Sequence, residues 1–281
     1  GFAELLFWAM LLALVWPSLR PTRWATRAAA LLPRPEIALP GIPAPSLLLS
    51  LLLFNLVFAI QNGLDLAFLW SGAPLPGGVT LADYAHRGAY PLIATALLAG
   101  LFVLVALKPG SASAANPAIR RLVVLWVAQN LFLVASSILR TLDYVAAYSL
   151  TGFRIAALAW MGLVAIGLAL ICWRMLRGRS AAWLINANAL MAALVLSAAS
   201  IVDLEASAAA WNVRHARETG GRGVELALCY LAQTGPSSLL ALVALERRPL
   251  PPAFRDRVRH VRGLVMADLA RRQAGWRSWT W

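Results

Sequence analysis

The strongest constraint on this chain is a succession of long apolar stretches, several of them close to the length that crosses a lipid bilayer. Hydrophobic residues make up 60% of the 281 residues, and charged residues make up only 13%. A soluble domain is about half apolar and about a quarter charged. Because a chain in lipid must satisfy its backbone hydrogen bonds internally, the sequence predicts an all-α, polytopic transmembrane helix bundle.

Breaks in the apolar pattern divide the chain into about six predicted spans. They cover residues 2–16, 46–70, 80–107, 122–139, 153–175 and 182–202. The first is short, since a span needs about 20 residues. The chain also begins at Gly1, so we expect further sequence and further helices upstream, with a cleaved signal peptide as the alternative. The predicted domains are a bundle over residues 1–205 and a helical tail over residues 206–281.

Arginine is distributed unevenly among the predicted loops. Loops 17–45, 108–121 and 174–181 carry most of the basic residues, whereas loops 71–88 and 140–152 each balance one Arg against one Asp. Basic residues accumulate in cytoplasmic loops. The pattern therefore predicts a multi-pass membrane protein with its C-terminal tail on the outer side. The arginine excess in an Ala/Leu-rich chain suggests a bacterial genome, so the predicted location is the bacterial inner (cytoplasmic) membrane with a periplasmic tail. The net charge of +13 indicates contact with anionic lipids and not with nucleic acid.

The tail is predicted to form a helical hairpin followed by a basic amphipathic helix. Residues 224–245 are apolar, but a glutamate, a glycine and a proline interrupt them, which favours a hairpin over a seventh span. Residues 252–273 carry arginines on one side and apolar side chains at helical spacing on the other. The apolar set is Phe254, Val258, Val261, Val265 and Leu269. This face either packs on the hairpin or lies on lipid, where the three following tryptophans favour the interface.

Amide side chains inside the predicted spans form a first group of candidate site residues. They are Gln61, Asn62, Gln129 and Asn130. Amides within spans most often hydrogen-bond between helices. We therefore expect a structural role, and a transport path is the alternative.

A second group lies at the outer ends of helices in the predicted orientation. Its members are Asp65, Asp83, Arg87, Arg140, Asp143, Tyr144, Arg154 and Asp203. Charged side chains in this half-polar zone should pair with one another. The group is predicted either to tie helix ends together or to form an extracytoplasmic pocket for a ligand or ion.

Catalytic and metal-binding patterns are scarce. Cys172 and Cys229 are separated by a predicted span, and no two histidines have ligand spacing. The sequence has no nucleophile elbow, zinc-protease motif or phosphate-binding glycine loop. We therefore expect no catalytic residues, no metal and no cofactor. A non-enzymatic scaffold, accessory subunit or sensor-like module is favoured, with a membrane protein partner or a homo-oligomer. A permease for a small solute or ion is the alternative, and a membrane enzyme is less favoured.

Several ordered motifs resemble a bacterial membrane protein family. They are Leu53-Phe54-Asn55-Leu56-Val57-Phe58 with Gln61-Asn62, then Tyr84-Ala85-His86-Arg87-Gly88, Tyr148-Ser149-Leu150-Thr151-Gly152-Phe153-Arg154, Trp211-Asn212, Tyr230-Leu231 and Gly235-Pro236. They resemble the domain of unknown function numbered forty-one seventy-three, with a sister set numbered forty-one fifty-three. In that family Arg is usual at the position of His86 and Gly at that of Ser149. The resemblance implies a membrane protein without an established activity, and its motifs largely coincide with the outer charged group.

Overall fold

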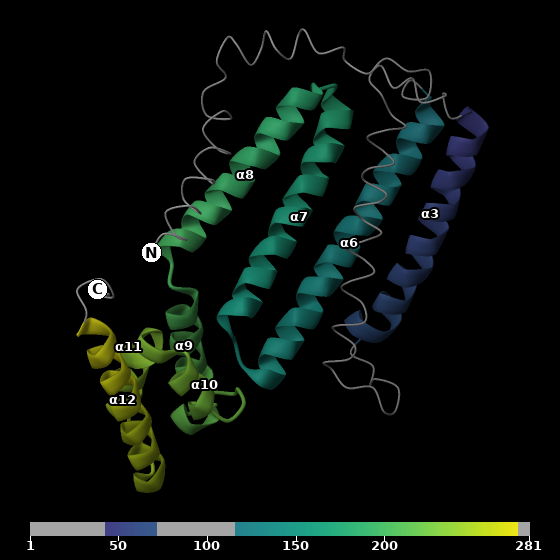
Figure 1. Ribbon diagram of the computed structural model, residues 1–281. Helices are drawn as coiled ribbons and strands as arrows, with labels where there is room; N and C mark the ends of the chain where they lie inside the picture. The colour runs from purple at the N-terminus through teal and green to yellow at the C-terminus, as the bar shows by residue number, and fades with distance from the viewer. Residues whose placement is uncertain (1–42, 72–115, 275–281) are drawn as a thin grey trace, which may run out of the picture. The chain divides into compact units, whose positions relative to one another are not determined.

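The computed structural model describes residues 43–71 and 116–274. The elements within these ranges are all helical, which confirms the predicted all-α fold (Figure 1). They are α3 (Ala44–Asp65) with the π-helix η1 (Leu66–Trp70), α6 (Pro117–Tyr148), α7 (Gly152–Arg177), α8 (Ala181–Ile201), α9 (Leu204–His215), η2 (Arg217–Thr219), α10 (Leu228–Gln233), η3 (Gly235–Ser238), α11 (Leu239–Glu246) and α12 (Pro252–Gln273).

Among the described residues, four helices are long and apolar enough to cross a membrane. They are Pro45–Trp70, Pro117–Tyr148, Gly152–Arg177 and Ala182–Ile201. These four correspond to the second, fourth, fifth and sixth predicted spans. The predicted spans 2–16 and 80–107 lie outside the described residues.

Helix α6 differs from the prediction at its C-terminal end. The sequence predicted a span that ended at Leu139 and a loop from Arg140, but the helix continues to Tyr148 and has 32 residues. That is about 48 Å at 1.5 Å per residue, longer than a hydrocarbon core of about 30 Å. The prediction took Arg140 as the end of the span. Its side chain instead pairs with Asp65 inside the bundle, so its charge does not end the helix.

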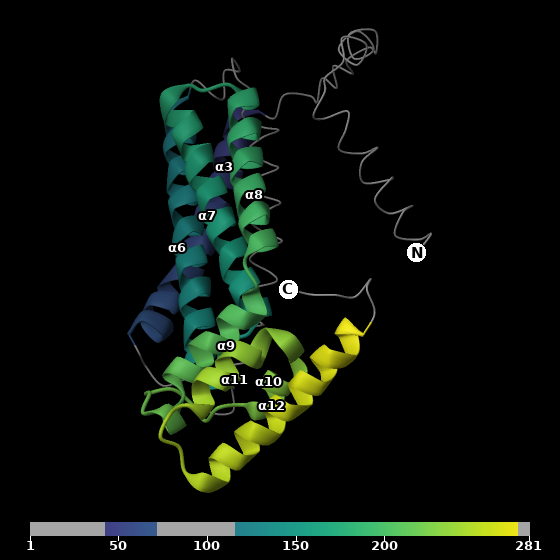
Figure 2. The same ribbon diagram turned by 90° about the vertical axis from the view of Figure 1, so that its left-hand side faces the viewer.

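Helices α3 and α6 run side by side in the same direction. Asn55 bonds to the carbonyl of Leu122, and Asn62 bonds to that of Gln129, so the partners advance together along both helices. Helix α7 then returns beside α6, and α8 returns beside α7 (Figures 1 and 2). The α6–α7 and α7–α8 connections are short, as antiparallel neighbours require. The C-terminal ends of α6 and α8 therefore lie on the same side of the bundle.

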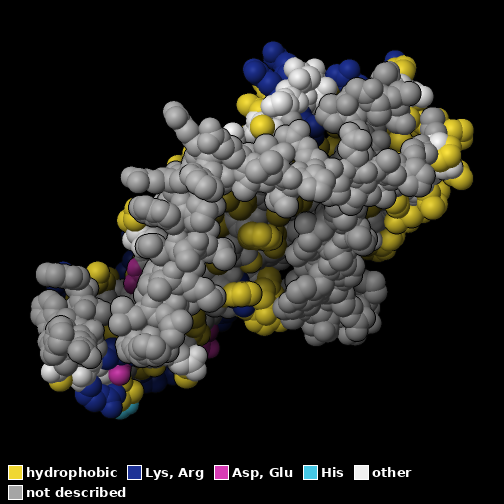
Figure 3. All heavy atoms as spheres, turned by 45° about the horizontal axis from the view of Figure 1, so that its top comes forward, with side chains coloured by type: hydrophobic (Ala, Val, Ile, Leu, Met, Phe, Trp, Pro, Cys, Tyr) yellow, Lys and Arg dark blue, Asp and Glu magenta, His cyan; other side chains and the backbone are white. Residues whose placement is uncertain are grey.

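Side-chain chemistry fixes the two tight turns. Thr151 accepts a hydrogen bond from the Arg154 N–H at the start of α7, and Ser180 accepts one from the Trp183 N–H at the start of α8. Both are N-caps of the preferred type. Gly178 ends α7 at φ 61°, a left-handed conformation that glycine adopts without steric cost. Basic side chains gather near the α7–α8 turn and, at the lower left, at the far end of the C-terminal helices (Figure 3).

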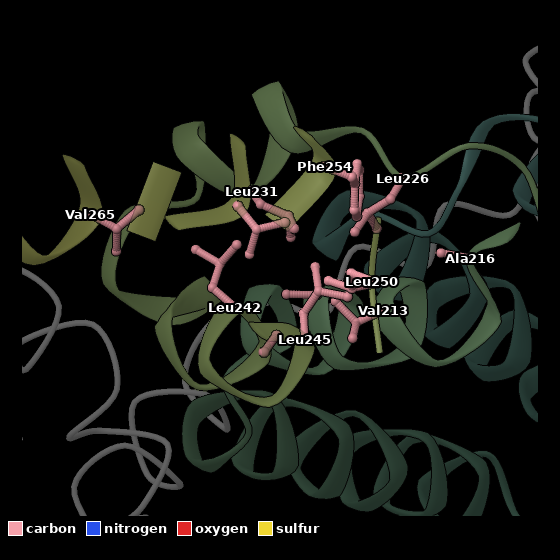
Figure 4. Packing of buried hydrophobic residues seen from close by; sticks show 12 residues of the cluster. Val213, Ala216, Leu226, Leu231, Leu242, Leu245, Leu250, Phe254 and Val265 are labelled. Atoms are coloured by element: carbon pink, nitrogen blue, oxygen red, sulfur yellow. The ribbon is translucent and has the colours of Figure 1, made fainter. Parts of the chain in front are cut away.

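Helices α9–α12 form a small subdomain with its own core (Figure 4). We call residues 203–273 the C-terminal subdomain. Its buried side chains come from α9, α10, α11 and α12, and the most deeply buried include Ala209, Leu231, Leu242, Leu245 and Val258. The stretch 224–245 breaks into α10, η3 and α11, so it does not form one continuous span. The subdomain begins close to the predicted boundary after residue 205.

The apolar face of α12 packs against the rest of the subdomain. Phe254, Val258 and Val265 are buried, and Val261 packs against the same cluster. The predicted packing of this helix on the preceding hairpin is therefore observed. The three tryptophans that follow lie outside the described residues.

Candidate functional site

The charged residues predicted at the outer helix ends divide into two separate sites. One lies between α3 and α6, and the other lies where the C-terminal subdomain meets the α6–α7 turn. Asp83 and Arg87 lie outside the described residues. Asp143 is exposed on α6 and has no ion pair among the described residues.

The first site centres on a buried ion pair. Arg140 of α6 pairs with Asp65, the last residue of α3, and the two residues are 6% and 1% exposed. Gln61, one turn earlier on α3, donates from Nε2 to Oδ1 of Asp65 (3.2 Å). A buried pair of this kind stabilises little in total, because both ions lose their hydration. Removing one partner is costly, because it leaves an uncompensated buried charge.

Amide side chains extend this site towards the middle of the bundle. Gln129 donates from Nε2 to Oδ1 of Asn55 (2.7 Å), and Asn55 donates to the Leu122 carbonyl (3.1 Å). Asn62 donates to the Gln129 carbonyl (3.3 Å). The predicted amides Gln61, Asn62 and Gln129 therefore lie in one interhelical network. Asn130 is buried but donates to Trp126 on its own helix (2.8 Å), so its recorded bond does not join the network.

Asn55 was quoted in the family motif but not proposed as a site residue. The signal that finds it is spacing: Leu47, Leu51, Asn55, Phe58, Asn62 and Asp65 recur every three or four residues along α3. Farther along, Trp70 donates from Nε1 to Ser136 Oγ of α6 (3.0 Å). We call Asn55, Gln61, Asn62, Asp65, Gln129, Ser136 and Arg140 the polar seam. Immediately after Asp65 the backbone becomes π-helical over Leu66–Trp70, a feature frequent at functional sites.

The second site is a clamp between the C-terminal subdomain and the α6–α7 turn. Asn212 of α9 is buried, and its Nδ2 donates to the Leu150 carbonyl (2.7 Å) while its Oδ1 accepts from the Leu150 N–H (2.8 Å). One side chain thus satisfies both backbone groups of a turn residue. Tyr230 of α10 accepts from the Gly152 N–H (3.3 Å) and donates to the Glu205 carboxylate. We call Asn212, Tyr230 and Glu205 the hairpin clamp.

Arg154 also bonds to the backbone of the α6–α7 turn. Its guanidinium donates to the carbonyls of Tyr148 (2.9 Å) and Ser149 and lies 4.2 Å from the centre of the Tyr144 ring. This is a cation–π contact. The structure therefore brings together the predicted residues Tyr144 and Arg154, around a turn and not around a carboxylate.

Asp203 is a helix cap. Its Oδ1 accepts from the Ala206 N–H (2.9 Å) at the start of α9. This hydrogen bond lowers the pKa of Asp203, because it favours the charged carboxylate. The prediction that Asp203 pairs within a charged group is not met among the described residues, since its carboxylate bonds to backbone N–H groups at the start of α9 and to the side chain of Ser237.

Burial is the largest influence on Tyr230. Burial and, after it, the hydrogen bond to Glu205 together raise the pKa of the Tyr230 phenol to about 12. Tyr230 therefore remains a neutral donor over the ordinary pH range. A Cβ at Gly152 would lie 2.7 Å from Cδ of Glu205, so a side chain there would displace the carboxylate that accepts from Tyr230.

Asn212 and Tyr230 were quoted only within the family motifs and not as site residues. Their joint role depends on which helix packs on which turn, and no local pattern contains that information. For metals, the described residues hold no group of three or more His, Cys, Asp or Glu side chains that could bind an ion. Cys172 and Cys229 are both free thiols.

Fold and sites together define a helical membrane protein whose C-terminal subdomain is clamped to one end of its helix bundle. The chain belongs to the family described as Domain of unknown function (DUF4153), whose model matches residues 1–245. This is the set that the motif resemblance gave as the sister, and membership in a family of unknown function is confirmed. No curated protein and no solved structure matches the chain.

Proposed function

We propose that this protein is a non-enzymatic module of the bacterial inner membrane: a scaffold, accessory subunit or sensor-like component. Its C-terminal subdomain would present a fixed surface in the periplasm to a membrane protein partner or a second copy. The observation that carries the proposal is the hairpin clamp. Asn212 and Tyr230 bond to the backbone of the α6–α7 turn, so the orientation of the subdomain follows that of the spans.

A surface held in this way suits an interaction role better than a tail on a flexible linker does. The subdomain has a packed core, and its outer side carries exposed groups that the core does not use. Leu240 on α11 is 81% exposed, and Arg257 on α12 is exposed. A rigid surface loses less conformational freedom on binding, which improves affinity.

Site-specific photo-crosslinking in intact cells tests this proposal. A crosslinking amino acid at Leu240 should yield one defined adduct with a partner or a second copy, and gentle purification should recover that species at fixed stoichiometry. The same group at Ile185, which is 66% exposed on α8 in mid-bundle, serves as the control and should not yield that adduct. A monodisperse monomer without crosslinked neighbours would contradict the proposal.

The clamp itself supplies a matched variant. Asn212→Ala removes the two-way pairing with Leu150 and should weaken the Leu240 adduct without changing the number of spans. Asn188→Ala is the control, because within the described ranges the Asn188 amide donates to Leu184 on its own helix. Equal adduct yield in both variants would show that partner binding does not depend on the hairpin clamp.

A permease for a small solute or ion is a second candidate, favoured by the buried Asp65–Arg140 pair within a bundle span. Ionisable residues inside spans often mark transport paths. Asp65→Asn should abolish flux in reconstituted vesicles if the pair carries the function, whereas Asp143→Asn on the exposed side of α6 should not. Unchanged flux in Asp65→Asn would remove this candidate.

A further inference from the structure

The polar seam contains hydrogen-bond acceptors that the described protein does not satisfy. Oδ1 of Asn62, Oδ2 of Asp65 and Oε1 of Gln129 are buried and have no hydrogen-bond partner among the described residues. Their sister atoms are used: Asn62 Nδ2, Asp65 Oδ1 and Gln129 Nε2 all take part in bonds within the seam. Every one of these three residues therefore leaves one oxygen available.

An open acceptor inside a membrane span demands a complement. Lipid offers no hydrogen bonds, so polar groups at this depth pair within the protein or with enclosed water. The Asp65 side chain is 2% exposed, which makes an unused carboxylate oxygen there especially unfavourable. The three oxygens lie on the mutually facing sides of α3 and α6, as the bonds that join those side chains show.

The charge balance of the seam restricts the missing complement to a neutral molecule. Arg140 already compensates Asp65, and the remaining seam members are uncharged amides and a serine. An added cation would bring a net charge into a low-dielectric site, which is costly. The three open oxygens of Asn62, Asp65 and Gln129 are acceptors, so a ligand that satisfies them must donate hydrogen bonds.

We propose that the polar seam is an intramembrane binding site for small neutral hydrogen-bond donors, of which water is the smallest. The site runs from the Asn55–Gln129 pair near the middle of α3 to the π-helical turn that follows Asp65. The ten steps along α3 from Asn55 to Asp65 correspond to about 15 Å at 1.5 Å per residue. The seam thus runs towards the end of the bundle that carries the C-terminal subdomain. This proposal does not rest on the scaffold function, and the crosslinking result does not bear on it.

Cysteine accessibility tests the proposal in the full-length protein in membrane vesicles. With Cys172 and Cys229 replaced by serine, single cysteines are introduced at Gln61, at Asn62 and at Ile60 as the control. Ile60 lies within one turn of both and is 59% exposed on the outer side of α3. The probes are a neutral hydroxyethyl methanethiosulfonate and its cationic ethylammonium analogue of similar size. A separate variant that retains Cys229 gives the reference ratio of the two reagents for an exposed thiol.

Asn62→Cys should react with the neutral reagent at least about tenfold faster than Ile60→Cys, because each unit by which apolar burial raises a thiol pKa lowers the reactive thiolate about tenfold. The neutral reagent should also be favoured over the cationic one relative to the Cys229 reference. Rates equal to that of Ile60→Cys would overturn the proposal, since the seam would then be dry. A preference for the cationic reagent would overturn the neutral ligand class. If the Asn62→Cys protein is not monodisperse, the same comparison is made with Gln61→Cys. That substitution disturbs the seam less, because it removes a single hydrogen bond to Asp65.

Discussion

Ser149, between α6 and α7, has a backbone conformation that side chains other than glycine rarely adopt. Its φ is 69° and its ψ is 166°, a region that is almost restricted to glycine and costs on the order of 1–3 kcal/mol for other residues. The turn tolerates this strain because Arg154 and Asn212 bond to its backbone. In the family that the Tyr148–Arg154 motif resembles, Gly is usual at the position of Ser149.

Ser149→Gly should therefore stabilise the protein by about 1 kcal/mol. The relief of strain exceeds the entropy that glycine adds to the unfolded chain, about 0.4–1 kcal/mol. Thermal unfolding in a mild detergent measures the change. Ser149→Ala is the control, because it removes the hydroxyl but retains Cβ and should give no comparable gain. A gain of equal size in Ser149→Ala would show that the hydroxyl, and not the backbone, is unfavourable.

The Asp65–Arg140 pair should behave as a coupled unit. Asp65→Leu alone leaves a buried guanidinium and should cost about 3–5 kcal/mol, and Arg140→Met alone should cost a similar amount. The double variant should cost far less than the sum, because apolar residues often replace a buried ion pair without loss. Denaturant unfolding of all four forms of the cycle measures the coupling energy. Additive costs would mean that the two side chains do not depend on each other.

At the scale of elements, the sequence predicted what depends on local pattern and missed what depends on partners. Four apolar helices lie where the apolar stretches and the polar breaks between them predicted spans, because the length and apolarity of a stretch suffice to define a span. The predicted C-terminal end of α6 was wrong, because it depended on Arg140, whose partner Asp65 lies 75 positions away in the sequence. The hairpin clamp was missed for the same reason: Asn212 and Leu150 are 62 positions apart.

The clamp between α9–α10 and the α6–α7 turn should weaken in strong alkali. A tyrosine in an unfolded chain has a pKa near 10, and Tyr230 in the folded protein has a pKa of about 12. Below pH 10 both states hold the proton, so the phenol adds no pH dependence. Between about pH 10 and pH 12 only the unfolded state loses it, so stability falls as the pH rises.

Denaturation of the subdomain followed from pH 8 to pH 12 measures this loss. Tyr230→Phe should remove the alkaline fall that belongs to this phenol, at the cost of the bonds to Gly152 and Glu205. Tyr144→Phe, on α6, is the control and should retain it. An identical alkaline profile in the parent chain and Tyr230→Phe would exclude Tyr230 as the titrating group.

At the scale of the whole molecule, the arginines that predict membrane orientation must be considered together with their ion-pair partners. The C-terminal subdomain is rich in arginine, which by itself would favour a cytoplasmic position. Several of these arginines are paired: Glu246 binds Arg259 and Arg262, and Asp268 binds Arg271 and Arg272. Long tails also escape the charge rule. The short α7–α8 turn carries Arg177 and Arg179 and remains the stronger indicator of the cytoplasmic side.

One accessibility measurement can therefore orient the described helices. Cys229 is exposed on the subdomain, whereas Cys172 lies near the opposite end of α7 and is half-buried. If the α7–α8 turn is cytoplasmic, a membrane-impermeant maleimide should label Cys229 in intact spheroplasts and leave Cys172 unlabelled. Denatured protein, in which both thiols react, confirms that each cysteine is free. Because the hairpin clamp fixes the subdomain beside the α6–α7 turn, protection of Cys229 until lysis would reverse the assigned direction of α6, α7 and α8 together.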